Sequence, residues 1–509
     1  MPSVKLILRI AIAALLIGVI TWISLDNIGL ISSENKKTAP VSSVVEPISS
    51  PYITEYLLPK GTWPSAILVD KNGIIWTVGA KSHTLFSFDQ KKGEFKSYPI
   101  SEERGPDNNG SSDKNSLMSW TMVEDNDGFI WFSQFGPDPL WRFDPHTEKF
   151  SAFHSISAAP FQMKVDKKTG NIWFTTLNGN TIGIIQKTEN KTVSYPIYKI
   201  TEFPLGNNTD PSGLFLQGDS VWVSEILKNR LARFTAIQND MGMVVDIVKN
   251  FEIPSNEQIR LVSPTDLLVS SNGTILLTEH GGSFLTKYKM DSQNVRRFPT
   301  SQNPYHTTTL PFWMSAGSGD NLWFNEHTGN RIASFNTTDL TLTEYEIPIQ
   351  DPSKGYVVYP LTIAVDPTNN NRLWFVELYN DKIGMVDGSL GIPFDIHTQV
   401  GKVELSTKKQ NTTTIDFKII EKNDSQLNKK NDVVSFKTSS SMTYWGELTN
   451  MTARFSVNSK ELTPLRENST VHLFLENYSS VMPGNYTLGI SATDGMAIKS
   501  IFMNLEIDF

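Results

Sequence analysis

Four glutamates occupy the same place in four consecutive copies of a short sequence pattern. Each ends an apolar run, and they are Glu225 in VWVSE, Glu279 in ILLTE, Glu326 in LWFNE and Glu377 in LWFVE. Carboxylates that converge repel each other unless a cation or protons lie between them, and Mg²⁺ and Ca²⁺ are the hard cations that prefer carboxylate oxygens. We therefore treat the four as candidate ligands of Mg²⁺ or Ca²⁺. The sequence leaves an alternative open, in which each carboxylate caps the turn of its own repeat.

Two histidines directly follow two of these glutamates. His280 stands in TEHGG and His327 in NEHTG, and both are candidates for a catalytic base. Neighbouring residues of an extended strand point to opposite sides, which favours a structural role such as a hydrogen bond to the next repeat. The chain contains no cysteine, so thiol catalysis, thiolate zinc sites and disulfides are excluded.

These residues belong to a repeat that runs through most of the chain. Its anchors are Trp76, Trp131, Trp173, Trp222, Leu276, Trp323 and Trp374, which recur at intervals of about 50 residues. Short strand-like runs separated by Gly, Asn and Asp turns, without helical periodicity, predict four antiparallel strands per repeat, which is one blade of a β-propeller. A blade buries its faces only against its neighbours, so we assign the anchors to the core between blades.

The last repeat lacks a fourth strand of its own. The segment 53–59, ITEYLLP, is similar to LTEYEIP at 342–348, the fourth strand of the sixth repeat. We expect the N-terminal segment to supply the outer strand of the last blade, which would cover an exposed sheet edge. The prediction is a seven-bladed propeller over residues 51–396.

The N-terminus carries a long apolar run behind Lys5 and Arg9. Its length matches a bilayer span, and positive charge on its N-terminal side places that end in the cytoplasm. We expect a transmembrane anchor over 1–26, a flexible stalk over 27–50, and the bulk of the chain outside the cell membrane. A cleaved signal peptide is the alternative to an anchor.

The C-terminal residues 397–509 have a different pattern, with few tryptophans and about seven short alternating strands, typical of an Ig-like β-sandwich. The chain also contains many Asn-x-Ser/Thr sequons, which predict a glycoprotein surface unless they reflect polar composition alone. The sequons are Asn109, Asn190, Asn207, Asn272, Asn336, Asn411, Asn423, Asn450, Asn468, Asn477 and Asn485.

The blade motif resembles that of the streptogramin B lyases (virginiamycin B lyase) over about residues 51–390. The stretches that carry the resemblance are WFNEHTGNRIASFNTTDLTLTEYEIP and WFVELYNDKIGMVD. The resemblance implies a seven-bladed propeller that opens a cyclic depsipeptide by elimination, with glutamates holding a divalent metal and a histidine as base. Among the four glutamates, Glu377 matches the implied metal-ligand set.

The resemblance places the base directly after the proline that opens each first strand. This chain has Ser65, Trp120, Phe161, Ser212, Thr265, Phe312 and Leu361 at the corresponding positions. Phe312 and Leu361 stand where the resemblance puts the essential histidines, and Tyr359 stands where it puts an accompanying glutamate. The aromatic residues Trp120, Phe161 and Phe312 either form one wall of a ligand rim or plug the central channel.

Three functions follow, and the last of them is a purely structural component of the cell envelope, which rests on the sequons and the sandwich alone. The first is a membrane-anchored extracytoplasmic propeller that binds a cell-surface glycan, peptide or protein at its rim, without histidine-dependent chemistry. The alternative is a metal-dependent lyase or lactonase-like enzyme that opens a cyclic ester with its rim glutamates. A formal net charge of −8 argues against nucleic acid as a partner.

Overall fold

The computed structural model describes most of the chain after residue 42. The described ranges are 43–100, 118–135, 139–154, 156–188, 197–253, 261–303, 306, 308–349, 357–408, 412–422, 433–440, 451–457, 459–461, 469–476 and 481–508. The expected anchor over 1–26 lies outside these residues. Within the described ranges, no helix has the length and apolar character needed to cross a membrane.

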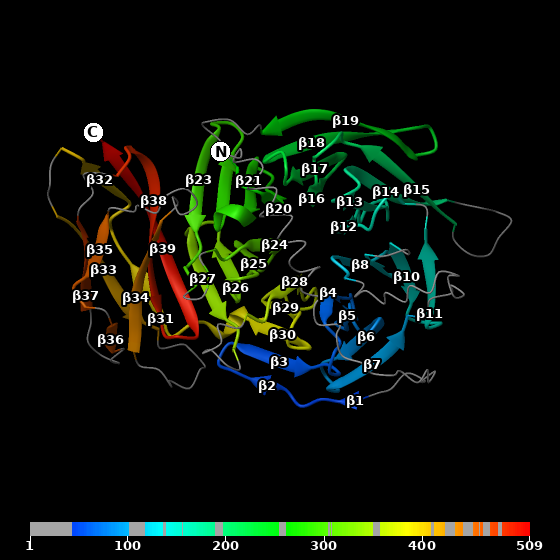
Figure 1. The fold of residues 1–509 in the computed structure, drawn as a ribbon, viewed down its shortest axis with the longest axis horizontal. Coiled ribbons are helices and arrows are strands. Elements are labelled where there is room, and N and C mark those ends of the chain that lie inside the picture. The colour runs from blue at the N-terminus through cyan, green and yellow to red at the C-terminus, as the bar shows by residue number, and fades with distance from the viewer. Residues whose placement is uncertain are drawn as a thin grey trace, which may run out of the picture.

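The first four propeller sheets follow one another along the chain, and Figure 1 shows their first strands nearest the centre. The first contains β4 (Pro64–Val69), β5 (Ile75–Gly79), β6 (Thr84–Asp89) and β7 (Glu94–Pro99). The second contains β8 (Met122–Glu124), β9 (Ile130–Ser133), β10 (Leu140–Asp144) and β11 (Lys149–Phe153). The third contains β12 (Gln162–Val165), β13 (Ile172–Thr176), β14 (Thr181–Thr188) and β15 (Ile197–Pro204). The fourth contains β16 (Pro211–Gln217), β17 (Ser220–Glu225), β18 (Arg230–Gln238) and β19 (Val244–Ile253).

Three further sheets complete the ring. The fifth contains β20 (Pro264–Val269), β21 (Thr274–Glu279), β22 (Phe284–Lys289) and β23 (Asn294–Pro299). The sixth contains β24 (Pro311–Ala316), β25 (Asn321–Glu326), β26 (Arg331–Asn336) and β27 (Thr341–Glu346). The seventh contains β28 (Pro360–Val365), β29 (Arg372–Glu377) and β30 (Lys382–Asp387). Each first strand contacts the first strand of the next sheet, and β28 contacts β4, so the seven blades form a closed ring.

The fourth strand of the seventh blade comes from the N-terminal segment. β3 (Ile53–Leu57) pairs antiparallel with β30, with Tyr56 opposite Ile383. The preceding residues also form short strands, β1 (Ser43–Val44) on β7 and β2 (Ile48–Ser49) on β3. The predicted flexible stalk therefore extends too far, because its last eight residues lie against the first and seventh blades.

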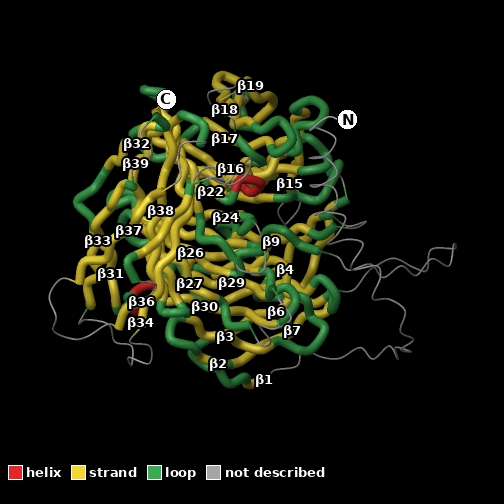
Figure 2. The backbone as a smooth tube through the Cα atoms, turned by 60° about the vertical axis from the view of Figure 1, so that its left-hand side comes forward, coloured by secondary structure: helices red, strands yellow, loops and turns green. Residues whose placement is uncertain are grey.

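The repeat anchors lie in the core between blades. Trp374 of the seventh blade packs on Phe88 of the first, with ring centroids 6.1 Å apart, and Tyr56 of β3 stacks on the same indole. Trp76 of the first blade likewise packs on a ring of the neighbouring blade, with its centroid 5.6 Å from that of Phe143. Burial of each large aromatic ring against a neighbouring blade is the main favourable term that holds such a ring together. Helix is limited in the described part to the short 3₁₀ turns η1 (His280–Gly282) and η3 (Gly388–Leu390), as Figure 2 shows.

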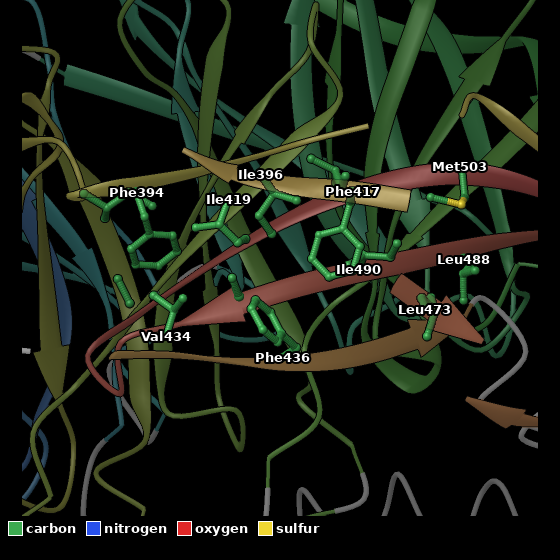
Figure 3. Close-up of a cluster of buried hydrophobic side chains, with 14 of the residues drawn as sticks. Phe394, Ile396, Phe417, Ile419, Val434, Phe436, Leu473, Leu488, Ile490 and Met503 are labelled. Atoms are coloured by element: carbon green, nitrogen blue, oxygen red, sulfur yellow. The ribbon is translucent and has the colours of Figure 1, made fainter. Parts of the chain in front are cut away.

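The C-terminal residues form two sheets packed on one apolar core (Figure 3). One sheet contains β31 (Phe394–His397), β33 (Thr413–Glu421), β35 (Thr452–Phe455) and β37 (Ser469–Glu476). The other contains β32 (Lys402–Ser406), β34 (Val433–Ser440), β36 (Ser459–Glu461), β38 (Gly484–Thr493) and β39 (Ala497–Asp508). Because β31 belongs to this module, its boundary lies at Phe394, slightly earlier than the predicted residue 397.

The C-terminal module continues the sheet of the sixth blade. β39 pairs antiparallel with β27, with Leu342 opposite Ser500 and Tyr345 opposite Ala497. The apolar core is also continuous, since Trp323 and Tyr345 of the sixth blade belong to the same buried cluster as Phe394 and Ile490 of the module. The sixth blade therefore has no exposed fourth-strand edge, which the sequence pattern did not predict.

The buried pair Lys382–Glu55 provides a test of the seventh blade. Its Nζ and Oε1 atoms are 2.7 Å apart, and both side chains are almost fully buried next to Glu377. We expect Lys382→Met to lower the free energy of unfolding by about 3–5 kcal/mol at pH 7, because the buried carboxylate of Glu55 then lacks its cation. Urea unfolding followed by tryptophan fluorescence measures this change.

Lys187→Met on β14 is the matched control. Lys187 is a half-exposed partner of Asp127, and loss of a surface ion pair costs at most about 1 kcal/mol. Equal destabilisation by the two variants would contradict the structural role assigned to Lys382.

Candidate functional site

The first strands begin with an unusual backbone turn around the central axis. In five blades the residue before the opening proline has a positive φ, between 45° and 58°: Trp63, Asp210, Ser263, Leu310 and Tyr359. A bulky side chain in this left-handed region is strained by about 1 kcal/mol or more, and such strain concentrates at functional sites. Trp63, Leu310 and Tyr359 therefore mark the entrance of the channel as a candidate site.

An aromatic plug fills the channel below this entrance. We define the plug as Trp120, Phe161, Phe312, Trp313 and Leu361, all of which are buried in one cluster. Trp120 packs on Phe161 at 4.9 Å between ring centroids, and Phe312 packs on Trp313 at 4.6 Å. Of the two interpretations of Trp120, Phe161 and Phe312, this packing favours a plug of the channel over one wall of a ligand rim.

A ring of partly exposed aromatic residues surrounds the plug. We call Trp63, Phe135, Tyr359 and Tyr379 the aromatic margin. Tyr379 lies 5.9 Å from the Trp63 ring and 5.8 Å from the Tyr359 ring, and Lys81 Nζ lies 4.9 Å from the Trp63 centroid. The margin therefore presents an apolar, π-rich surface that a cation already contacts at one end.

His280 and His327 tie neighbouring blades together. The imidazole Nδ1 of His280 lies 3.2 Å from the Pro311 carbonyl oxygen, and Nε2 of His327 lies 3.1 Å from the carbonyl oxygen of Leu361. Each nitrogen must donate its proton, because a carbonyl oxygen only accepts. Each histidine thus holds the first strand of the following blade.

The two imidazoles are poor bases in this environment. Burial lowers the pKa of His280 to about 4. Burial, followed by the neighbouring His280, lowers the pKa of His327 well below its usual value. Both rings also pack against Phe312, at 5.1 and 4.2 Å between centroids. A general base works best with a pKa near the operating pH, so neither histidine is well suited to proton abstraction.

The four candidate metal ligands do not converge. All four are fully buried, and three pair with an arginine of their own blade: Glu225 with Arg230 at 2.9 Å, Glu279 with Arg297 at 2.7 Å and Glu326 with Arg331 at 3.8 Å. Within the described ranges, no three His, Asp or Glu side chains form a group that would hold a metal ion. The predicted Mg²⁺ or Ca²⁺ site of these residues does not fit the geometry.

The surroundings of two of these glutamates favour the neutral form of the carboxyl group. Burial, and then Glu344, raises the pKa of Glu326 well above its usual value. Burial also raises the pKa of Glu377, and Glu55 raises it further. Glu377 accepts a hydrogen bond from Asn380 Nδ2 at 3.0 Å. At Glu225 and Glu326, an arginine five residues after the glutamate was a signal in the sequence for a pair within the blade.

Asp210 is a candidate site residue that the sequence reasoning missed. It precedes Pro211 at the entrance, and its backbone oxygen accepts a hydrogen bond from Ile226, which packs against the plug. Among the described residues, nothing donates to its carboxylate or pairs with it, and burial raises its pKa to about 6. A partly buried carboxylate without a partner and with a raised pKa is a candidate for a binding site. The Asp-Pro dipeptide at a repeat position was the available signal.

The raised pKa of Asp210 gives a pH-dependent prediction. Its pKa is about 6 in the folded protein, against 3.8 for an unperturbed aspartate, so its favourable contribution is complete below pH 3.8 and is lost as the pH rises through 6. We expect Asp210→Asn to raise the free energy of unfolding at pH 7.5 by about 1–2 kcal/mol, allowing for partial exposure, and to leave it nearly unchanged at pH 4. Urea unfolding at both pH values measures this.

Asp219→Asn, at an exposed turn of the same blade, is the control and should change neither value. A destabilisation at pH 7.5 by Asp210→Asn would show that the Asp210 carboxylate has a favourable partner in the folded protein.

The solved structures that are similar to this chain match it over its propeller. No protein-family model and no curated protein sequence matches the chain. Virginiamycin B lyase from Staphylococcus aureus is a similar solved structure, with 23% identity, a TM-score of 0.50, and coverage of 66% of this chain and 98% of that one. A catalytically inactive histidine-to-alanine variant of that enzyme with quinupristin matches at 22% identity and a TM-score of 0.50, with the same coverage. The propeller of this chain therefore has the fold of the streptogramin B lyases.

Proposed function

We propose that this chain is a binding protein that captures a peptide-like amphipathic ligand at the aromatic margin, without opening a cyclic ester. The observation that carries the proposal is the plug. Phe312 and Leu361 occupy the positions of the base implied by the resemblance, and both are buried in a packed apolar cluster. Neither side chain can accept a proton, so the reaction lacks its base.

The entrance supplies three features that support ligand binding. The aromatic margin is partly exposed, Trp63 and Tyr359 hold a strained backbone conformation, and the Asp210 carboxylate has no partner among the described residues. Aromatic rings favour apolar and cationic groups, and a carboxylate favours a cation. A peptide that carries aromatic and basic side chains matches both, which is why we favour it over a neutral glycan.

The location of the protein is part of the proposal. We place the propeller on the outer side of the cell membrane, held by the apolar segment over 1–26. Support comes from the sequence alone, through the positive charges that precede the apolar run. In this arrangement the ligand is a component or peptide of the cell surface.

Binding is tested first with quinupristin and with an array of peptides that contain lysine and tryptophan. We expect saturable quenching of tryptophan fluorescence by quinupristin or by a subset of the peptides, because Trp63 lies in the margin. We expect Phe135→Ala to weaken binding about tenfold, the typical worth of one aromatic contact.

Phe251→Ala is the matched control. It removes an equally half-buried ring, which packs on Trp222 in the outer part of the fourth blade, and it should leave the affinity unchanged. Equal loss in both variants, or binding of neutral glycans alone, would contradict a peptide site at the margin.

Catalysis is tested with the same compound. We expect quinupristin to be recovered intact after long incubation with the full-length chain and Mg²⁺, with cyclic and linear forms separated by chromatography. The reason is the absence of a base at Phe312 and Leu361 and the low pKa of His280. Rapid linearisation would overturn the proposal and favour the lyase or lactonase-like alternative.

The metal-dependent alternative has its own test at Glu326. Because burial and the neighbouring Glu344 raise the pKa of Glu326 and so favour its neutral form, Glu326→Gln should change the free energy of unfolding by less than about 1 kcal/mol. We also expect no rise in melting temperature with Mg²⁺ or Ca²⁺ in either protein. A rise in the wild-type chain that Glu326→Gln abolishes would establish a metal ligand and contradict the glutamate pairs described above.

A further inference from the structure

A large groove lies between the fifth blade and the C-terminal module, away from the channel entrance. Its volume is about 980 Å³, and β22 and β23 form one side while β32, β38 and β39 contribute the other. Figure 1 shows β23 and β38 next to each other, and the two strands are in contact. A cavity of this size accommodates a ligand of several linked units.

The propeller side of the groove carries a row of positive charge. Lys287 and Lys289 are two residues apart on β22 and therefore share one face of the strand. Arg296 on β23 stands directly opposite Lys287 in the strand register. Like charges in directly opposed positions destabilise a sheet. The fold therefore maintains three neighbouring cations here at an energetic cost.

These three cations have no carboxylate partner in the described part of the chain, although the Arg296 guanidinium lies 5.1 Å from the Phe298 ring centroid. No described carboxylate lies within ion-pair distance of Lys287, Lys289 or Arg296. Arg296 donates from Nη2 to the Phe502 carbonyl oxygen at 3.3 Å, while its Nε is buried without a partner. The other two cations that line the groove are neutralised, Arg297 by Glu279 and Lys402 by Glu404 and Glu506.

The excess of positive charge also affects the pKa values of these groups. Burial lowers the pKa of Lys287, and the neighbouring charges of Lys289 and Arg296 lower it further. Burial also lowers the pKa of Arg296. An anion in the groove would relieve both the repulsion and the cost of burial.

The remaining lining favours a polar, non-aromatic ligand. It includes Ser292, Asn294, Asn485 and Asn504, whose hydroxyl and amide groups donate and accept hydrogen bonds. Among the described residues that line the groove, Tyr486 is the single aromatic one. Proteins that bind single-stranded nucleic acid stack bases on several aromatic rings, and they are rarely as acidic overall as this chain with its net charge of −8.

We propose that the groove binds an anionic polysaccharide whose successive units carry sulfate, phosphate or carboxylate groups. Lys287 and Lys289 are about 7 Å apart along β22, so they engage two anionic groups rather than one. The amides of Asn485 and Asn504 in the C-terminal module contact the sugar hydroxyls from the opposite side. The site is separate from the aromatic margin and does not depend on the function proposed for it.

The test uses the full-length chain in detergent and a sulfated hexasaccharide prepared from heparin. We expect saturable binding in titration calorimetry that weakens with added salt, and no binding of the desulfated hexasaccharide. Lys287→Gln/Lys289→Gln should weaken binding about tenfold or more, since two charge-assisted contacts are lost. The single variant Lys289→Gln, at an exposed position, should give a smaller loss in the same direction and keeps the test informative if the double variant folds poorly.

The matched control is Lys96→Gln/Lys199→Gln. It removes the same charge from two exposed lysines on β7 and β15 and should leave the affinity unchanged. Equal loss in both double variants would show that net charge alone attracts the saccharide and would overturn the site. Tighter binding of a single-stranded thymidine oligonucleotide of equal charge would overturn the ligand class, and absence of any binding would overturn the proposal.

Discussion

The structure depends on the burial of each blade against the next. No blade has a core of its own, so Trp374 of the seventh blade must pack on Phe88 of the first, and β3 must bring Tyr56 to the same contact. This constraint closes the ring through a strand that precedes the first blade in the sequence. It also brings Trp63 and Tyr379, which are more than 300 residues apart, to within 5.9 Å at the channel entrance.

Closure determines the chemistry at the axis. Seven first strands converge there, and the space between them is filled by the plug, so polar groups nearby lose contact with water. Each must then be neutral or paired. Glu225 and Glu279 meet arginines, Glu326 and Glu377 have raised pKa values, and the histidines are neutral donors to backbone oxygens. Asp210, which has no described partner, is the exception.

The sequence predicted the blades and the pairing of Ile53–Leu57, because both depend on local pattern and on burial of an edge. It did not predict the glutamate arrangement. Equivalent positions in successive blades are related by rotation about the axis, so the repeat alone does not show whether a side chain points to the axis or to its own blade. Glu225 turns toward Arg230 and Glu326 toward Arg331, both within one blade. The contact of β39 with β27 was also out of reach, because many apolar edge strands satisfy the same pattern and three-dimensional packing selects one.

The junction between the sixth blade and the C-terminal module fixes the position of the two walls of the basic groove. Because β39 extends the sheet of β27 and the two parts share a core that contains Trp323 and Ile490, the module is joined to the propeller by packing rather than by a loose linker. A shared core resists relative motion. The walls of the basic groove, one from each part, are therefore held at a defined separation before any ligand arrives. Preorganisation of this kind lowers the entropic cost of binding, and it allows three repelling cations to remain on a folded sheet.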